Sequence, residues 1–217
     1  MDKISLEESK NIKIFKRFES KYILDEDYVN DFIELLENDY FLVTDKNQIL
    51  FHYHSLYFDT PKLAMWNDHE NDKQIRQKIR IREYDDNSKF LEIKEKNNEQ
   101  TIKTRIPVKS YNINEETNWI SHNLKYDTKN LLKSLDVKYD RMTFIKKNKT
   151  ERITIDFNLE YYNYHTNKIW KTINNQVIIE IKKSYKENNE IENILNNKFD
   201  FYKQKYSKYH FGIKKTS

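Results

Sequence analysis

The sequence predicts an α+β fold: an antiparallel sheet of about eight strands, enough to close a barrel, with helices packed outside it. Three observations predict this fold. Charged and apolar residues alternate in several segments, as they do in strands with two unlike faces. Shorter segments with helical spacing lie between them. The 217 residues fit one domain with a sizeable core, and they contain no internal repeat or linker.

We expect a polar, flexible N-terminal arm at residues 1–12 and a single domain over 13–217. Strands are expected at 15–24, 49–59, 76–84, 89–96, 101–108, 137–147, 151–162 and 176–184. Helices are expected at 26–38, 61–66, 115–123, 127–135 and 188–198. Asp25 is a natural N-cap for the first of these helices, and Pro61 suits the first turn of the second.

Composition excludes several classes of site. With one glycine, the chain has no glycine-rich phosphate loop or dinucleotide fingerprint. Without cysteine it has no disulfide, thiolate zinc site or cysteine nucleophile, and its six histidines form no H-E-x-x-H motif. No apolar run is long enough to span a membrane, and the N-terminus is too charged for a signal peptide, so we expect a cytoplasmic protein.

Charged residues recur at every second position and therefore share one face of each expected strand. They are Arg17, Glu19 and Lys21; Lys78, Arg80 and Arg82; Glu92, Lys94 and Lys96; Lys103 and Arg105; Arg152 and Asp156; Glu180 and Lys182. A solvated sheet face is the ordinary interpretation. However, neighbouring cations such as Arg80 and Arg82 repel unless an anion lies between them. A barrel with its charges inside would suit a polyphosphate group and its metal ion.

Nine motifs follow one another from residue 17 to residue 209. They are R-F-E-S-K-Y (17–22), S-L-Y-F-D-T (55–60), K-I-R-I-R-E-Y (78–84), L-E-I-K-E-K (91–96), K-T-R (103–105), Y-D-R (139–141), E-R-I-T-I-D (151–156), I-I-E-I-K (178–182) and S-K-Y (207–209). As an ordered set they resemble the VTC (vacuolar transporter chaperone) catalytic domain, the polyphosphate polymerase branch of the triphosphate tunnel metalloenzymes. The resemblance implies a closed eight-stranded antiparallel tunnel lined by lysine, arginine and glutamate.

The resemblance also implies roles for individual residues. The expected phosphate-binding residues are Lys21, Arg80, Arg82, Lys94, Lys103, Arg141, Arg152 and Lys208. Of these, the expected catalytic residues are Lys21, Arg80, Arg82, Arg152 and Lys208. Glu180 is the expected main ligand of Mn²⁺ or Mg²⁺, with Glu19 and Glu92 helping directly or through water.

Each of these residues also has a structural interpretation. Glu92 can pair with Lys94 across strands, and Lys182 can face solvent or balance Glu180. Tyr22, Tyr84 and Tyr209 are expected to pack in the wall, and Asp59 to serve as a turn or cap residue. His52, His54 and His210 are expected to be surface or structural residues.

Arg17 stands where hydrolytic and cyclase branches carry the first carboxylate of E-x-E-x-K. The missing carboxylate matches the VTC branch and weakens the case for a two-metal hydrolase.

The resemblance implies transfer of the terminal phosphate of a nucleoside triphosphate, with ATP as the expected donor, to a growing polyphosphate chain. The expected partners are these two substrates, with a separate membrane protein needed if the product is exported; that protein could hold the domain at the inner membrane face. The alternatives are a metal-dependent inorganic or nucleoside triphosphatase and a non-catalytic polyphosphate-binding subunit. No nucleic-acid partner is expected, because the net charge of +4 is modest and carboxylates interleave with the bases.

Overall fold

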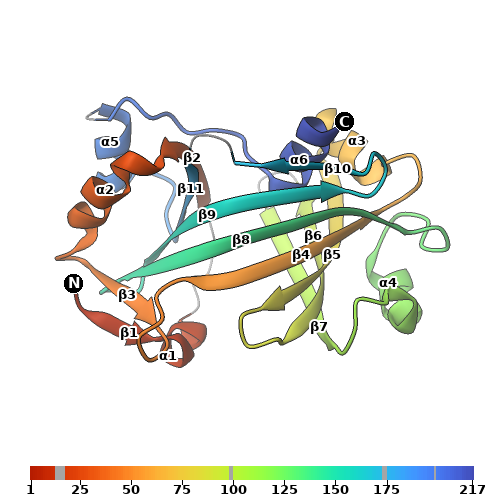
Figure 1. The fold of residues 1–217 in the computed structure, drawn as a ribbon, viewed down its shortest axis with the longest axis horizontal. Helices are drawn as coiled ribbons and strands as arrows, with labels where there is room; N and C mark the ends of the chain where they lie inside the picture. The colour runs from red at the N-terminus through yellow and green to blue at the C-terminus, as the bar shows by residue number, and fades with distance from the viewer. Residues whose placement is uncertain (13–17, 98–99, 173–174, 198) are drawn as a thin grey trace. The chain divides into compact units, whose positions relative to one another are not determined.

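The computed structural model describes residues 1–12, 18–97, 100–172, 175–197 and 199–217. These residues form an α+β fold with an eleven-stranded sheet (Figure 1). The strands are β1 (Lys3–Ser5), β2 (Phe18–Asp25), β3 (Tyr40–Thr44), β4 (Phe51–Asp59), β5 (Ile75–Tyr84), β6 (Lys89–Asn97), β7 (Gln100–Val108), β8 (Leu132–Lys146), β9 (Glu151–Asn163), β10 (Lys168–Lys171) and β11 (Gln176–Lys183). The helices are α1 (Leu6–Asn11), α2 (Val29–Leu36), α3 (Ala64–Glu70), α4 (Thr117–Asn123), α5 (Glu190–Asn197) and α6 (Lys208–Thr216).

The main strand order is β2-β11-β9-β8-β4-β5-β6-β7, and β1, β3 and β10 attach beside this path. The path does not return from β7 to β2 among the described residues, so the prediction of a closed eight-stranded barrel was wrong in both closure and strand number. The reason is that the alternation of charged and apolar residues is the same in an open sheet and in a barrel. It predicts two-faced strands and says nothing of closure.

Most of the predicted elements are present. The eight predicted strands correspond to β2, β4, β5, β6, β7, β8, β9 and β11, and residues 15–17 of the first lie outside the described residues. Short 3-10 turns, Glu26–Tyr28 and Ile113–Glu116, precede α2 and α4. Residues 1–12 hold β1, which pairs in parallel with β3, and α1, which begins with a capping box between Ser5 and Glu8. The expected short helix after Pro61 begins later, at Ala64.

The helix predicted at 127–135 is absent. Asp127 Oδ1 accepts a hydrogen bond from the backbone N–H of Lys129 at 3.0 Å, which starts a turn rather than a helix. From Leu132 onward the chain extends as β8, where Leu135 and Val137 are both fully buried on one face. Two closely spaced leucines, Leu131 and Leu132, thus resembled a helical pattern across a turn and the start of a strand.

The chain divides into two compact units. Unit 1 comprises Met1–Phe51, Asp140–Leu159 and Thr172–Tyr206, and unit 2 comprises His52–Tyr139, Glu160–Lys171 and Ser207–Ser217. The long strands β8 and β9 contribute residues to both units. None of the helices formed by the described residues is long and apolar enough to cross a membrane.

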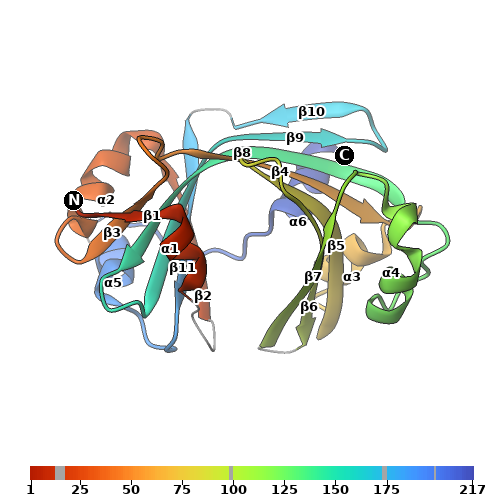
Figure 2. The ribbon, with the colours of Figure 1, turned by 90° about the horizontal axis from the view of Figure 1, so that it is seen from below.

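In each unit, helices cover the apolar face of the strands. In unit 1, Phe32 and Leu36 of α2 and Leu195 of α5 pack against Ile155 and Ile179. Figures 1 and 2 show α2 and α5 side by side. This arrangement leaves Arg152, Asp156, Glu180 and Lys182 on the opposite face, whereas Lys183 lies on the covered face and pairs with Glu192 of α5.

Unit 2 has the same two-faced arrangement. Met65 of α3 and Ile120 of α4 pack against Ile79 and Ile93 of β5 and β6. Figure 2 shows α3 and α4 together on one side of β5, β6 and β7. Burial of these apolar faces orders the strands, and Arg80, Arg82, Glu92 and Lys94 of the same strands point the other way.

The only glycine of the chain, Gly212, lies where α6 packs against the sheet of unit 2. A Cβ added there would lie 2.5 Å from Leu135 Cδ2 and closer still to the ring of Tyr161. Both neighbours are fully buried, so they have little room to move.

We therefore expect Gly212→Ala to lower the free energy of unfolding by about 1–3 kcal/mol, although alanine favours helices over glycine. Urea denaturation measures this change. The control is Lys214→Ala, an exposed position of the same helix, which should stay within about 0.5 kcal/mol of wild type. Equal stability of Gly212→Ala and wild type would contradict the packing of α6.

Candidate functional site

The register of unit 2 aligns charged residues into rows across neighbouring strands. Arg80 of β5 lies opposite Glu92 of β6, which lies opposite Arg105 of β7. The next row on the same face brings Lys78, Lys94 and Lys103 opposite one another. The predicted phosphate-binding residues of β5, β6 and β7 therefore lie on one continuous face.

Glu92 is the centre of this face. Its Oε2 accepts hydrogen bonds from Nε and Nη2 of Arg80 at 3.0 and 2.7 Å, and its Oε1 accepts one from Lys103 Nζ at 2.9 Å. Tyr84 donates to the same Oε1 at 3.4 Å. Because Glu92 is only 1% exposed, these donors replace the water that its carboxylate would otherwise need.

The charges of this cluster shift one another's pKa values. Burial alone would raise the pKa of Glu92, but Arg80, Arg82 and Lys103 outweigh it and hold the pKa well below its usual range. Partial burial lowers the pKa of Lys103 to about 8, opposed by the carboxylate of Glu92. Glu92 is thus ionised at neutral pH and helps Lys103 to keep its charge.

Tyrosine side chains contact Arg80 and Arg82 of β5. Arg80 also donates from Nη1 to the hydroxyl of Tyr57 at 2.8 Å. Arg82 donates to Ser55 Oγ at 3.1 Å, and its guanidinium carbon lies 5.6 Å from the centre of the Tyr53 ring. These contacts fix the directions of both guanidinium groups.

Lys208 enters from α6 rather than from a strand. Its Nζ lies 4.6 Å from the centre of the Tyr139 ring. Ser207 caps the helix, and its Oγ also accepts a hydrogen bond from Lys78 Nζ at 2.6 Å. Ser207, the N-cap of α6, is therefore hydrogen-bonded to Lys78, the first lysine of the row across β5, β6 and β7.

Unit 1 contains a second ionic cluster, around Arg141 of β8. Its Nε and Nη2 bond both oxygens of Asp156 at 2.6 and 2.8 Å, and Asp156 is fully buried. Arg141 Nη2 also lies 4.0 Å from Glu180 Oε2. The bidentate hydrogen bond to Asp156 therefore orients the guanidinium of Arg141 toward Glu180.

Glu180 is surrounded by cations. Lys182 Nζ lies 3.2 Å from its Oε2, and Lys21 Nζ lies 3.7 Å from its Oε1. Lys182 therefore balances Glu180, one of the two roles considered from the sequence. Lys21 also donates to the carbonyl of Tyr206 at 3.0 Å and lies 4.0 Å from Glu19.

Arg152 donates hydrogen bonds to backbone carbonyl groups. Its Nη2 donates to the carbonyl oxygens of Ser9 and Ile12 at 2.8 and 3.2 Å. These carbonyls belong to the end of α1, whose last turn carries partial negative charge. The C-terminal end of α1 thus contacts a predicted phosphate-binding residue.

The donor set of unit 1 fits Mg²⁺ or Mn²⁺ delivered together with phosphates. Such ions take one or two protein carboxylates and complete their coordination with water and phosphate oxygens. Glu180 and Glu19 both lie beside the ammonium of Lys21, within 4.0 Å. The described residues contain no group of three or more acidic or histidine side chains that could hold a metal.

The predicted site residues thus fall into two sets. Lys21, Arg141, Arg152, Glu19 and Glu180 belong to unit 1, and Arg80, Arg82, Lys94, Lys103, Lys208 and Glu92 belong to unit 2. Arg17, which supplied the argument about the missing carboxylate, lies outside the described residues. Both oxygens of Glu92 are bonded by cations, and its expected part in metal binding stays a prediction.

Sequence reasoning missed several members of these clusters. The sequence placed Asp156 on the charged face with Arg152, but its pairing with Arg141 was not predicted. No signal in the sequence pointed to the carbonyls of Ser9, Ile12 and Tyr206. Tyr22 and Tyr209 are buried as expected, and Asp59 Oδ1 accepts from Met65 N–H at the start of α3.

A protein-family model, the VTC domain, matches residues 16–217, nearly the whole chain. The chain belongs to the VTC family. The resemblance to the VTC domain seen in the sequence motifs is thereby confirmed. No curated protein matches the chain.

Solved structures share the fold of this VTC domain at low sequence identity. One is a protein from Hippeastrum, proposed to be an adenylyl cyclase and described as having a dominant triphosphatase activity. It is 12% identical in sequence, the match covers 94% of this chain and 97% of that chain, and the TM-score is 0.54. Another is a proposed adenylate cyclase from Bacillus halodurans, with 10% identity, 78% and 81% coverage and a TM-score of 0.53.

We expect Glu92→Gln to lower the free energy of unfolding by about 3 kcal/mol at neutral pH, because Arg80 and Lys103 lose their shared anion. Urea denaturation measures it. The control is Glu95→Gln on the opposite face, whose partner Lys125 is 57% exposed; it should change stability by less than about 1 kcal/mol.

The loss should also depend on pH. The folded-state pKa of Glu92 is lowered, so its stabilising effect is complete above its ordinary pKa of 4.5 and disappears as pH falls toward the folded-state value. Wild type and Glu92→Gln should therefore become more alike in acid. A difference in stability that does not depend on pH would contradict an ionised Glu92.

Proposed function

We propose that this VTC domain is a polyphosphate polymerase. It transfers the terminal phosphate of a nucleoside triphosphate, with ATP as the expected donor, to the end of a growing polyphosphate chain. Membership of the VTC family supports the proposal, as does the charged face in each unit. The proposed partners are these two anionic substrates, and a separate membrane protein would be needed to export the product.

The observation that carries the proposal is the row of Lys78, Lys94 and Lys103. Like charges directly opposite one another on neighbouring strands weaken a sheet. Lys103 is paired with Glu92 and Lys78 bonds Ser207, yet the row still places three lysines side by side, which suits a ligand with repeated negative charges. A polyphosphate chain has this property along its whole length.

The proposed phosphate-binding residues are Lys21, Arg141 and Arg152 in unit 1 and Arg80, Arg82, Lys94, Lys103 and Lys208 in unit 2. The guanidinium groups of Arg80 and Arg141 already have fixed directions, because Glu92 and Asp156 each bond them at two points. Fixed cations lose little freedom when the substrate binds, and they oppose the charge that develops during phosphoryl transfer.

The proposed reaction joins a terminal oxygen of the acceptor chain to the γ-phosphorus of the donor. The bond between that phosphorus and the bridging oxygen breaks, and the electron pair leaves with the nucleoside diphosphate. The chain grows by one phosphate. A terminal phosphate oxygen is already largely deprotonated near neutral pH, so this transfer needs no general base.

The proposed metal ligands are Glu180 and, directly or through water, Glu19. A bound Mg²⁺ or Mn²⁺ supplies positive charge to the phosphate oxygens. Lys21 and Lys182, the cations beside Glu180, orient its carboxylate and share the phosphate charge.

A triphosphatase is the second candidate, favoured by the Hippeastrum structure of the same fold and its described activity. Hydrolysis needs a positioned base or second metal to orient water. Both oxygens of Glu92 are instead bonded by cations that lower its pKa, which makes it a weak base and favours transfer to phosphate. Asp156 is likewise bonded at both oxygens, by Arg141.

Incubation of the protein with ATP and Mn²⁺, followed by sizing of the products on a gel, tests the proposal. We expect nucleoside diphosphate and phosphate chains longer than the triphosphate supplied. Free inorganic phosphate without longer chains would identify a triphosphatase instead.

We expect Glu180→Gln to abolish turnover but to retain at least partial binding of tripolyphosphate, measured by calorimetry, because the surrounding cations remain. The matched control is Glu160→Gln, a surface glutamate paired with the exposed Lys171, which should keep wild-type turnover. Full turnover in Glu180→Gln would rule out the proposed role of Glu180. If the wild-type protein binds tripolyphosphate but shows no turnover, only the non-catalytic, polyphosphate-binding subunit remains.

A further inference from the structure

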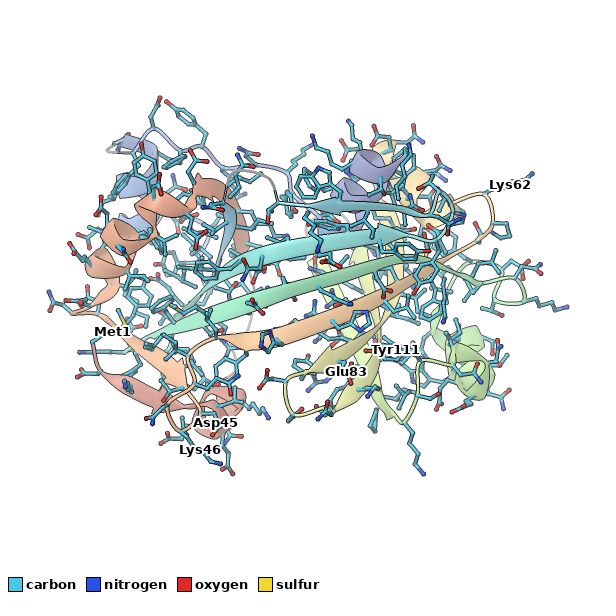
Figure 3. All side chains as sticks on the ribbon, viewed as in Figure 1. Met1, Asp45, Lys46, Lys62, Glu83 and Tyr111 are labelled. Carbon is cyan, nitrogen blue, oxygen red and sulfur yellow. The ribbon has the colours of Figure 1, made fainter. Side chains whose placement is uncertain are left out.

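Unit 2 contains a hydrogen-bonded chain of four side chains on the face opposite Arg80 and Arg82. It consists of Asp136 of β8, His54 of β4, Tyr111 after β7 and Glu83 of β5, and we call it the His54 network. Figure 3 shows Glu83 and Tyr111 together. None of its members belongs to the proposed phosphate or metal site.

The contacts of the His54 network are all short. His54 Nε2 lies 2.6 Å from Asp136 Oδ1, and His54 Nδ1 lies 2.7 Å from the Tyr111 hydroxyl. The same hydroxyl lies 2.5 Å from Glu83 Oε2. The imidazole therefore joins two carboxylates, one directly and one through Tyr111.

These three contacts require three protons, because each joins two electronegative atoms at hydrogen-bond distance. The hydroxyl of Tyr111 supplies one proton and a neutral imidazole supplies one. If Tyr111 donates to Glu83, either His54 donates from both ring nitrogens or Asp136 is itself protonated and donates to His54 Nε2. If Tyr111 donates to His54, Glu83 must itself be protonated. The chain therefore binds one proton more than its neutral imidazole and phenol supply.

The surroundings of the carboxylates assign this proton to His54. Burial would raise the pKa of Glu83, but hydrogen bonds from Lys89 and Tyr111 outweigh it and lower the pKa. The pKa of Asp136 is lowered in the same way by His54 and Tyr164, against burial. Both directions favour the ionised carboxylates, and the imidazole of His54, which bonds Asp136 and Tyr111, is the remaining place for the extra proton.

The other charged groups around the network surround the carboxylates rather than the imidazole. Lys89 of β6 lies 2.5 Å from Glu83 Oε1 and over the ring of Tyr111. Lys138 of β8 acts on Asp136, and Lys133 lies over the ring of Tyr164, whose hydroxyl bonds Asp136 at 2.6 Å. The nearest anions to His54 are therefore Asp136 and Glu83, at 2.6 and 3.8 Å.

The His54 network lies directly behind Arg82. His54 and Glu83 are opposite each other in the pairing of β4 with β5, and the next pair along is Ser55 with Arg82. Ser55 accepts the hydrogen bond from Arg82 Nε at 3.1 Å. A change in the spacing of His54 and Glu83 is thus transmitted through one peptide unit in each strand to a proposed phosphate-binding residue.

We propose that protonated His54, held between Asp136 and Glu83, is a positioning residue that aligns β4 with β5 and so sets the direction of Arg82 for triphosphate binding. This inference rests on the proposed function. When His54 loses its proton, one contact of the chain must break, and Glu83 and Asp136 lose the cation between them. Triphosphate affinity then falls as pH rises.

The experiment compares wild type with His54→Gln, which cannot carry the proton. Binding of inorganic tripolyphosphate is measured by calorimetry between about pH 6 and pH 8.5, while NMR follows the imidazole nitrogens of the wild type. We expect wild-type affinity to fall at least threefold more than that of His54→Gln over this range, and to follow the titration of His54.

Two further variants complete the test. His52→Gln, at an exposed histidine two residues earlier in β4, should keep the wild-type pH profile. Tyr111→Phe removes only the hydroxyl that requires the extra proton, so it should flatten the profile as His54→Gln does, and it carries the test if His54→Gln does not fold.

Identical pH profiles in wild type, Tyr111→Phe and His54→Gln would overturn the inference and leave the proposed function standing. Failure of the wild type to bind tripolyphosphate at any pH would overturn both.

Discussion

Buried carboxylates whose two oxygens are both bonded by cations are the interaction on which the ionic faces of this VTC domain depend. Glu92 is almost inaccessible to water yet ionised, because Arg80 and Lys103 occupy its two oxygens. Asp156 has the same relation to Arg141. A buried charge without such partners would cost several kcal/mol. Loss of either the carboxylate or its cation therefore destabilises the group that remains.

This pairing also explains how the sheet tolerates so many cations. Two-point bonds fix the guanidinium groups of Arg80 and Arg141, and aromatic rings contact Arg82 and Lys208. The cations are therefore positioned before any anion arrives, and substrate binding has less side-chain freedom to remove. The apolar faces of the same strands are covered by helices, so each strand both builds the core and presents charge.

Much of this arrangement could be predicted from residue spacing. The period of two placed Arg80, Arg82 and Glu92 on one face and Ile79, Ile81 and Leu91 on the other, as found. Closure of the sheet could not be predicted, because the same period occurs in open and closed sheets. Nor could the backbone carbonyl groups that accept hydrogen bonds from Arg152 and Lys21, since every residue carries such a group. The His54 network was overlooked because its members are far apart in sequence and only the pairing of β4, β5 and β8 brings them together.

The most direct test of the account is a crystal structure of the protein with bound tripolyphosphate. We expect ordered phosphate groups within hydrogen-bond distance of Arg80, Lys103 or Arg141, with Glu92 and Asp156 still bonded to their cations. Phosphates found only at exposed surface lysines such as Lys62, with the strand faces empty, would contradict it.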